Sequence, residues 1–226
     1  TTALIKMEDS SDTEMAIKIT AFQWRWKYEY LDHDISFISS LSSESNTARQ
    51  LNSGIAADSV DNYLLDVDHP LVLPVGVKIK FLITADDVIH SWWVPDLGWT
   101  RDARPGFVNQ AWTNIEKPGT YRGQCAELCG KDHGFMPIVV IALPMDEFEA
   151  WTNEQMAKVQ SREMDASRLW TKQELMQHGQ TVYENLCATC HQPEGQGLEP
   201  ACPALAGSEI ATGPVEAHID IVMNGR

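Results

Sequence analysis

One short stretch of the sequence places four soft metal-binding side chains within twelve positions. They are two thiols, an imidazole and a thioether, from Cys125, Cys129, His133 and Met136. Glycines and a proline interrupt the stretch, which predicts a compact loop rather than a helix. A second imidazole is available from His90, which we expect at the end of a strand. Such a loop can direct all these side chains toward one point, as a metal site requires.

The donor types distinguish between metals. Zinc accepts four Cys and His ligands, so the two thiols and two imidazoles alone would satisfy a zinc site. The thioether of Met136 argues against zinc, because thioethers are soft, weak ligands that are typical of copper. A single blue-copper ion takes two His, one Cys and a distant Met, which leaves one thiolate over. If both thiolates bridge, the two His, the Met and one backbone carbonyl complete two four-coordinate coppers.

The spacing Cys-x-Glu-x-Cys-x3-His-x2-Met, with a His thirty-five residues before the first Cys, resembles the binuclear copper site (CuA) of cytochrome c oxidase subunit II. The likeness extends beyond the loop, because further segments resemble signatures of that family in the same order. They are Gln-Trp-Arg-Trp-Lys-Tyr-Glu-Tyr (23–30), Asp-Val-Ile-His-Ser-Trp (87–92), Asp-Ala-Arg-Pro-Gly (102–106) and Asn-Gln (109–110). The resemblance covers the greater part of the chain.

The resemblance implies a role for each donor. The copper ligands would be the side chains of His90, Cys125, Cys129, His133 and Met136, together with the main-chain carbonyl of Glu127. The carboxylate of Glu127 would hold a magnesium or manganese ion at the interface with the catalytic subunit. Trp24 would be the point at which electrons enter from cytochrome c. We expect Trp26 to pack in the core instead, because aromatic residues at strand spacing usually pack.

A second group of residues, Cys187, Cys190 and His191, has the Cys-x-x-Cys-His spacing of a c-type haem attachment site. The two thiols bind the haem vinyl groups, and the histidine binds the iron. A redox dithiol or half of a zinc site would share the two cysteines. The histidine directly after the second cysteine favours haem.

Residues 179–213 resemble a class I cytochrome c domain. The resemblance implies that the Pro203 carbonyl accepts a hydrogen bond from the second nitrogen of the haem-binding histidine, which fixes the ring. Met223 is the only Met after the haem motif. It matches a packing position of the family, so we expect it in the core and the axial iron ligand beyond Arg226. We assign no role to Cys202.

Period-two and helical patterns predict the elements that hold these residues. Strands are predicted at 14–30, 77–84, 107–112, 119–124 and 137–143, an exposed loop at 36–59, and helices at 146–156 and 172–185. Short strands separated by Pro-Gly turns predict a β-sandwich. The resemblance makes this sandwich cupredoxin-like. The expected fold is therefore mainly β, with a cupredoxin-like binuclear copper domain at 1–157, a helical linker at 158–171 and a small, truncated all-α class I cytochrome c domain at 172–226.

Composition and charge limit the partners. The chain carries 17 Lys and Arg against 32 Asp and Glu, a net charge of −15, which excludes nucleic acid as a ligand and favours a basic partner such as cytochrome c. No apolar run approaches the roughly 20 residues needed to cross a bilayer. The five cysteines include two close pairs, which indicate cofactor ligands rather than a disulfide framework.

A copper sandwich followed by haem c resembles the fused subunit II of bacterial caa3-type oxidases. That resemblance implies an electron relay from haem c to binuclear copper and on to catalytic subunit I, which reduces oxygen. It implies other oxidase subunits as partners. It also implies the periplasmic face of the bacterial inner membrane, with attachment through N-terminal helices absent from this chain. The alternative is the copper relay domain of a nitrous oxide reductase, which has a similar loop but Trp at the position of Glu127 and a large propeller domain.

Overall fold

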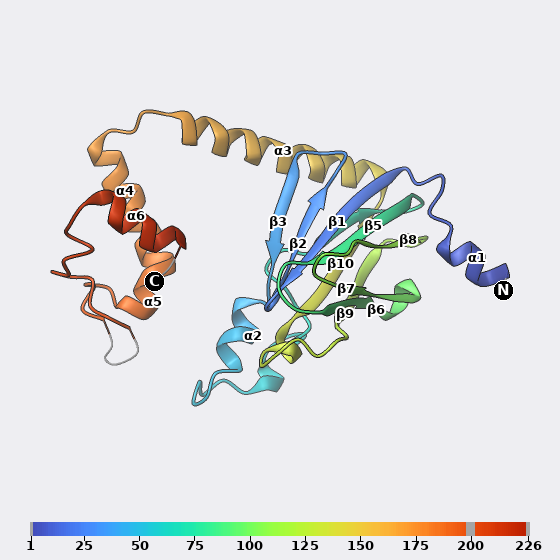
Figure 1. The fold of residues 1–226 in the computed structure, drawn as a ribbon, viewed down its shortest axis with the longest axis horizontal. Helices are drawn as coiled ribbons and strands as arrows, with labels where there is room; N and C mark the ends of the chain where they lie inside the picture. The colour runs from blue at the N-terminus through green and yellow to red at the C-terminus, as the bar shows by residue number, and fades with distance from the viewer. Residues whose placement is uncertain (1, 198–201, 225–226) are drawn as a thin grey trace. The chain divides into compact units, whose positions relative to one another are not determined.

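A computed structural model describes residues 2–197 and 202–224 (Figure 1). The chain forms two compact units, Thr1–Asp165 and Ala166–Arg226. The division falls within the range 158–171 that we expect for the linker, and this range is helical as far as Ser167. Each unit is described by itself below.

The first unit is a β-sandwich of two five-stranded sheets, ordered β3-β2-β1-β5-β8 and β4-β10-β9-β6-β7. The strands are β1 (Met15–Phe22), β2 (Arg25–Tyr30), β3 (Ile35–Ser39), β4 (Leu71–Pro74), β5 (Lys78–Ala85), β6 (His90–Val94), β7 (Trp99–Ala103), β8 (Asn109–Asn114), β9 (Gly119–Cys125) and β10 (Pro137–Leu143). Strands β5, β8, β9 and β10 confirm four of the five predicted strands to within a few residues. Strands β4, β6 and β7 were missing from the prediction because each is only four or five residues long.

The core lies between the two sheets and is rich in aromatic side chains. Trp92 on β6 is fully buried, and its ring stacks on Phe81 and Trp99 with centroids 5.6 and 5.1 Å away. Trp26 is also fully buried, as predicted. Burying one such side chain contributes about 2 to 3 kcal/mol, so these rings dominate the stability of the sandwich.

The prediction of a single strand over 14–30 is wrong, because the segment folds into a hairpin of β1 and β2 that turns at Gln23 and Trp24. The buried apolar residues fall on odd numbers in β1 and on even numbers in β2. They are Met15, Ile17, Ile19 and Ala21, then Trp26, Tyr28 and Tyr30. Side chains alternate faces along a strand, so this change of phase marks a turn. The aromatic run has no Gly or Pro at Gln23 and Trp24, so its sequence gives no sign of the turn.

The prediction of an exposed loop over 36–59 is wrong in its first half. That half holds most of β3 and a short helix, α2 (Ser43–Ala48), and a 3-10 turn, η1 (Ala57–Ser59), follows. The Ser42 side chain caps α2 by accepting a hydrogen bond from the Ser45 amide. Ser45 and Ala48 are buried, so α2 packs on the sandwich. Ser and Asn favour helix caps as well as loops, and composition alone did not separate the two.

Three further turns or helices surround the sandwich, namely α1 (Thr2–Glu8), η2 (Pro95–Leu97) and η3 (His133–Phe135). A long helix, α3 (Met145–Ser167), follows β10 and confirms the helix predicted at 146–156. Its first turn buries Phe148, and the Trp151 ring lies 5.4 Å from that of Tyr30. None of the described helices has the length and apolar character to cross a membrane.

The second unit is helical. Its elements are α4 (Lys172–Val182), a π-helical turn η4 (Tyr183–Cys187), α5 (Ala188–His191) and α6 (Val215–Asn224). Helix α4 begins with a capping box between Thr171 and Glu174. The prediction that Met223 packs in the core is wrong, because its side chain is 75% exposed. It shares an apolar face of α6 with Ile219 and Val222, and no described element covers this face.

Candidate metal centre and haem site

Strand pairing brings the predicted copper donors together. Cys125 ends β9, and the loop from β9 to β10 carries Cys129, His133 and Met136. His90 begins β6 rather than ending a strand, since the loop 86–89 separates it from β5. Strands β6 and β9 pair with Trp92 opposite Cys125, so His90 starts beside the donor loop.

The sulfur and nitrogen atoms of four of these residues, His90, Cys125, Cys129 and His133, lie close together. Cys125 Sγ lies 3.8 Å from Cys129 Sγ and 3.9 Å from His90 Nδ1. Cys129 Sγ lies 3.5 Å from His133 Nδ1. The ligand atoms of His90, Cys125 and Cys129 are all within 4.8 Å of one another, and Met136 is buried in the same core cluster. This is a soft donor set that fits copper.

The carbonyl oxygen of Glu127 belongs to the same group, because it lies 3.3 Å from Cys125 Sγ. The Glu127 side chain is exposed. The backbone and the carboxylate of this residue therefore lie in different environments, one beside the thiols and the other in solvent.

Asp87 orients His90. Its carboxylate lies 2.9 Å from His90 Nε2 and accepts hydrogen bonds from the backbone amides of Gln23 (2.7 Å) and Val88 (2.6 Å). An imidazole that donates through Nε2 keeps Nδ1 free for a metal, and Nδ1 is the nitrogen that faces Cys125. Asp87 belongs to the 87–92 signature, and its position three residues before a candidate ligand is the sequence signal for this positioning role.

The two thiols differ electrostatically. Burial raises the pKa of Cys125, but hydrogen bonding to His90 and to the backbone of Ser91 outweighs burial and lowers the pKa to about 7. Burial, together with the neighbouring Cys125 charge, raises the pKa of Cys129 to about 12. Cys125 is therefore the more acidic of the two thiols.

Trp24 contacts the main chain of the donor loop. Its half-buried indole donates a hydrogen bond from Nε1 to the Cys129 carbonyl at 3.2 Å, and Gln23 Nε2 donates to the same oxygen at 2.8 Å. On its other side, Lys131 Nζ lies 5.1 Å from the centre of the indole ring system. The β1–β2 turn is therefore fastened to a predicted copper ligand.

Gly130 permits this contact, and its replacement should disturb it. A Cβ at Gly130 would lie 2.9 Å from Gln23 Nε2 and 3.1 Å from Trp24 Cζ2, at a φ of +120°. We expect Gly130→Ala to destabilise the first unit by about 1 to 3 kcal/mol. Gly134→Ala is the matched control, since nothing lies within 4 Å of its added Cβ. Chemical unfolding followed by tryptophan fluorescence measures both. Equal losses in the two variants would contradict the close packing of Trp24.

The haem motif lies at the end of a helical run. Cys187 ends η4 and His191 ends α5, while the side chain of Cys190 lies outside the described residues. His191 Nδ1 lies 2.8 Å from the Pro203 carbonyl oxygen, which confirms the hydrogen bond implied by the resemblance. Gly197 allows the chain to fold back, because a Cβ there would lie 2.6 Å from the Ala204 nitrogen. The Pro203 carbonyl leaves His191 Nε2 for iron, which fits a haem.

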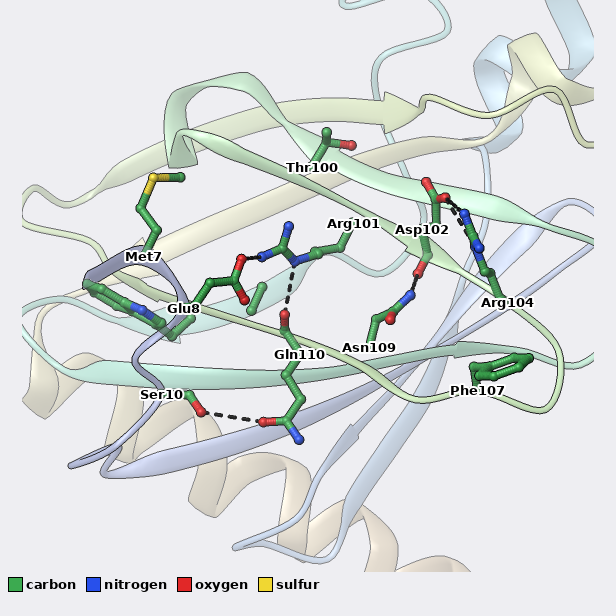
Figure 2. Close-up of a pocket in the computed structure, with 12 residues that line it drawn as sticks. Met7, Glu8, Ser10, Thr100, Arg101, Asp102, Arg104, Phe107, Asn109 and Gln110 are labelled. Atoms are coloured by element: carbon green, nitrogen blue, oxygen red, sulfur yellow. Dashed lines mark hydrogen bonds and ion pairs between the residues drawn. The ribbon is translucent and has the colours of Figure 1, made fainter. Parts of the chain in front are cut away.

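Four of the signature residues, Asp102, Arg104, Asn109 and Gln110, line a separate cavity of about 680 Å³ between α1 and strands β7 and β8 (Figure 2). Its charged groups are paired. Arg101 Nη2 lies 2.5 Å from the Glu8 carboxylate, and Arg104 Nη2 lies 2.7 Å from that of Asp102. None of the predicted site residues lines this cavity. The hydrogen bonds and ion pairs of these residues join β7, β8 and the loop between them.

Comparisons with known proteins agree with this geometry. Residues 15–143, more than half of the chain, match the family described as cytochrome c oxidase subunit II, periplasmic domain. Residues 176–224 match the cytochrome c family. A solved structure, the periplasmic domain of subunit II of cytochrome oxidase from Bradyrhizobium japonicum, is 35% identical with a TM-score of 0.57 and covers 66% of this chain and 98% of that one.

Curated relatives are similar over the same region. Probable cytochrome c oxidase subunit 2 of Rickettsia felis is 43% identical over 145 residues, which is 64% of this chain and 43% of the relative. The corresponding protein of Rickettsia bellii is also 43% identical over 145 residues, or 64% of this chain and 50% of the relative. The chain thus spans at most half the length of these relatives.

The fold, the donor geometry and these matches point to the same assignment. The sandwich is cupredoxin-like, as predicted, and a cytochrome c region follows it. The two family matches imply copper in the first unit and haem in the second. The chain therefore belongs to the cytochrome c oxidase subunit II family, with a cytochrome c domain after the periplasmic domain that defines the family.

Proposed function

We propose that this chain relays single electrons in a haem-copper oxidase. Electrons pass from haem c in the second unit to a binuclear copper centre in the first, and then to a membrane subunit that reduces oxygen. The observation that carries the proposal is the convergence of two buried thiols with two imidazole nitrogens, at 3.5 to 3.9 Å. Two thiols at this distance can both bridge a pair of copper ions. A site with a single copper or zinc ion needs no bridging thiol.

The ligands are proposed to be the side chains of His90, Cys125, Cys129, His133 and Met136 with the Glu127 carbonyl. When bound, the copper pair supplies a one-electron carrier. The protein holds its donors in place, since Asp87 fixes His90, and the core packs around the thiols and the thioether. Donors that are fixed and shielded from water change little between oxidation states, which favours fast electron exchange.

Trp24 is proposed as the point at which electrons enter from an external donor. Its hydrogen bond to the Cys129 carbonyl supports this role, because it joins the indole to a ligand residue in one step. The net charge of −15 supports a basic cytochrome c as one such donor.

The acceptor is proposed to be the catalytic subunit I, within a complex that holds other oxidase subunits at the periplasmic face of the bacterial inner membrane. Exposed apolar side chains near the donors support a covering partner. Val88 and Ile89 precede His90, Leu128 precedes Cys129 and is 77% exposed, and Phe107 in the β7–β8 loop is 68% exposed. Contiguous patches of such groups mark interaction sites, and we propose that these side chains form part of one.

The Glu127 carboxylate, exposed beside Leu128, is proposed to hold a magnesium or manganese ion against that partner. Hard divalent ions prefer carboxylate oxygens. Divalent-ion analysis of the assembled complex tests this role, and an equal ion content in Glu127→Gln would contradict it.

Copper analysis of the full chain tests the proposed relay. We expect two coppers per chain and, after partial oxidation, an electron paramagnetic resonance spectrum in which one unpaired electron couples to two copper nuclei. Shared coupling follows from the two bridging thiolates. One copper per chain, or coupling to a single nucleus, would overturn the proposal, and uptake of zinc in preference to copper would favour a structural metal site.

A further inference from the structure

Arg49, directly after α2, contacts the copper loop although it is far from it in the sequence. Its guanidinium nitrogen Nη1 lies 3.5 Å from the Asp132 carboxylate. The same guanidinium lies over the Phe135 ring, with Cζ 4.3 Å from the ring centroid. Asp132 precedes the ligand His133, and Phe135 precedes the ligand Met136. One side chain therefore holds both ends of the turn between two proposed ligands.

The helix side of this contact is itself fixed. Arg49 Nε donates a hydrogen bond to Asn46 Oδ1 at 2.8 Å, within α2 and its cap. Ser45 is fully buried, and its hydroxyl accepts a hydrogen bond from the Leu64 amide at 3.1 Å. A planar guanidinium that is hydrogen-bonded at one edge is well suited to stack on an aromatic ring. Helix α2 can therefore act as a rigid support for the loop.

On the loop side, Asp132 also pairs with Lys131, whose Nζ lies 2.8 Å from its carboxylate, but the turn itself has few backbone hydrogen bonds. The turn η3 is only three residues long, and its backbone hydrogen bonds run from the His133 amide to the Gly130 carbonyl (3.2 Å) and from the Phe135 amide to the Asp132 carbonyl (2.9 Å). Short 3-10 turns have poor hydrogen-bond geometry. His90 is oriented by Asp87, but in the described part of the chain no hydrogen bond holds the second ring nitrogen of His133.

We propose that Arg49 is a positioning residue for the His133 side of the copper centre. It acts through Asp132 and Phe135 and keeps His133 Nδ1 near the Cys129 thiol in the absence of metal. We call the contact of Arg49 with Asp132 and Phe135 the clamp. Only the measurement of copper release rests on the proposed function, because the clamp itself is a contact of the metal-free protein.

Two glutamine variants of the full chain test the clamp. In Arg49→Gln we expect copper to transfer to an external chelator about tenfold faster, the low end of the effect of an outer partner of a ligand. In the metal-free chain, hydrogen exchange of the His133 and Phe135 amides should also accelerate. Arg122→Gln is the matched control. Arg122 also forms an ion pair, with Asp66 at 3.0 Å, and its side chain is 29% exposed, compared with 22% for that of Arg49. Both rates should stay at wild-type values in the control.

The outcomes are separable. Equal rates in the two variants would overturn the inference, because they would mean that Arg49 only fastens α2. Arg49→Lys keeps the charge but not the planar stack, so rates between those of wild type and Arg49→Gln are expected, and it replaces Arg49→Gln if that variant does not fold. If wild type binds no copper, the proposed function fails, whereas the amide exchange of the metal-free chains still decides the clamp.

Discussion

Replacing Cys129 by serine should eliminate the paired copper centre. A serine hydroxyl is a hard and weakly acidic donor, so it cannot replace a bridging thiolate between two soft copper ions. Cys129 Sγ lies within 3.8 Å of both Cys125 Sγ and His133 Nδ1, so its loss removes the atom that joins the two halves of the site. We expect copper content to fall from two to at most one per chain, measured by metal analysis of the loaded protein.

The control is Cys202→Ser, which changes a cysteine of the second unit and should keep both coppers. In Cys129→Ser, any remaining copper signal should show coupling to one nucleus. Two coppers with shared coupling in that variant would show that Cys129 does not bridge, and the ligand assignment would then be wrong.

Replacing Trp92 by alanine should give the largest loss of stability in the first unit. Its side chain is fully buried, stacks on both Phe81 and Trp99 and directs its indole nitrogen toward the Tyr28 hydroxyl at 3.3 Å. Truncation of a buried aromatic residue costs about 3 to 5 kcal/mol, because a cavity remains where the ring was. The free energy of unfolding from a denaturant titration measures the loss. Since Trp92 faces Cys125 across the β6–β9 pair, copper should also dissociate faster.

Trp93→Ala provides the comparison, because Trp93 is on the same strand but only partly buried. Its loss of stability should be clearly smaller. If both variants lose the same free energy, the core between the sheets does not depend on the stack centred on Trp92.

The candidate copper and haem donors can be proposed from the sequence because their chemistry is local. Cys125, Cys129, His133 and Met136 lie in one loop, and the candidate haem residues lie within five positions, so residue type and spacing select them without knowledge of the fold. His90 is a candidate only in combination with that loop, since a single histidine beside a strand is usually structural.

Residues that hold the donors could not be predicted in the same way. Arg49 reaches Asp132 from a helix that the composition of 36–59 concealed, and its role depends on a contact across the fold. The Gln23 hydrogen bond to the Cys129 carbonyl depends on a hairpin turn without Gly or Pro. The exposure of Met223 depends on what packs against α6, which a periodic pattern does not reveal. Donors that lie close together in the sequence could therefore be proposed from it, whereas contacts between distant segments could not.

The two parallel strand pairs determine when the metal site can form during synthesis. Strand β1 pairs in parallel with β5, joining Met15 to Ile79, and β4 pairs in parallel with β10, joining Leu71 to Val140. Neither sheet can be completed until distant parts of the chain are available. Pairings between strands that lie far apart in the sequence form slowly. The donor loop lies between β9 and β10, so its two ends are fixed only after Leu143 has left the ribosome. The converged set of donors is therefore expected only in chains whose two sheets have paired.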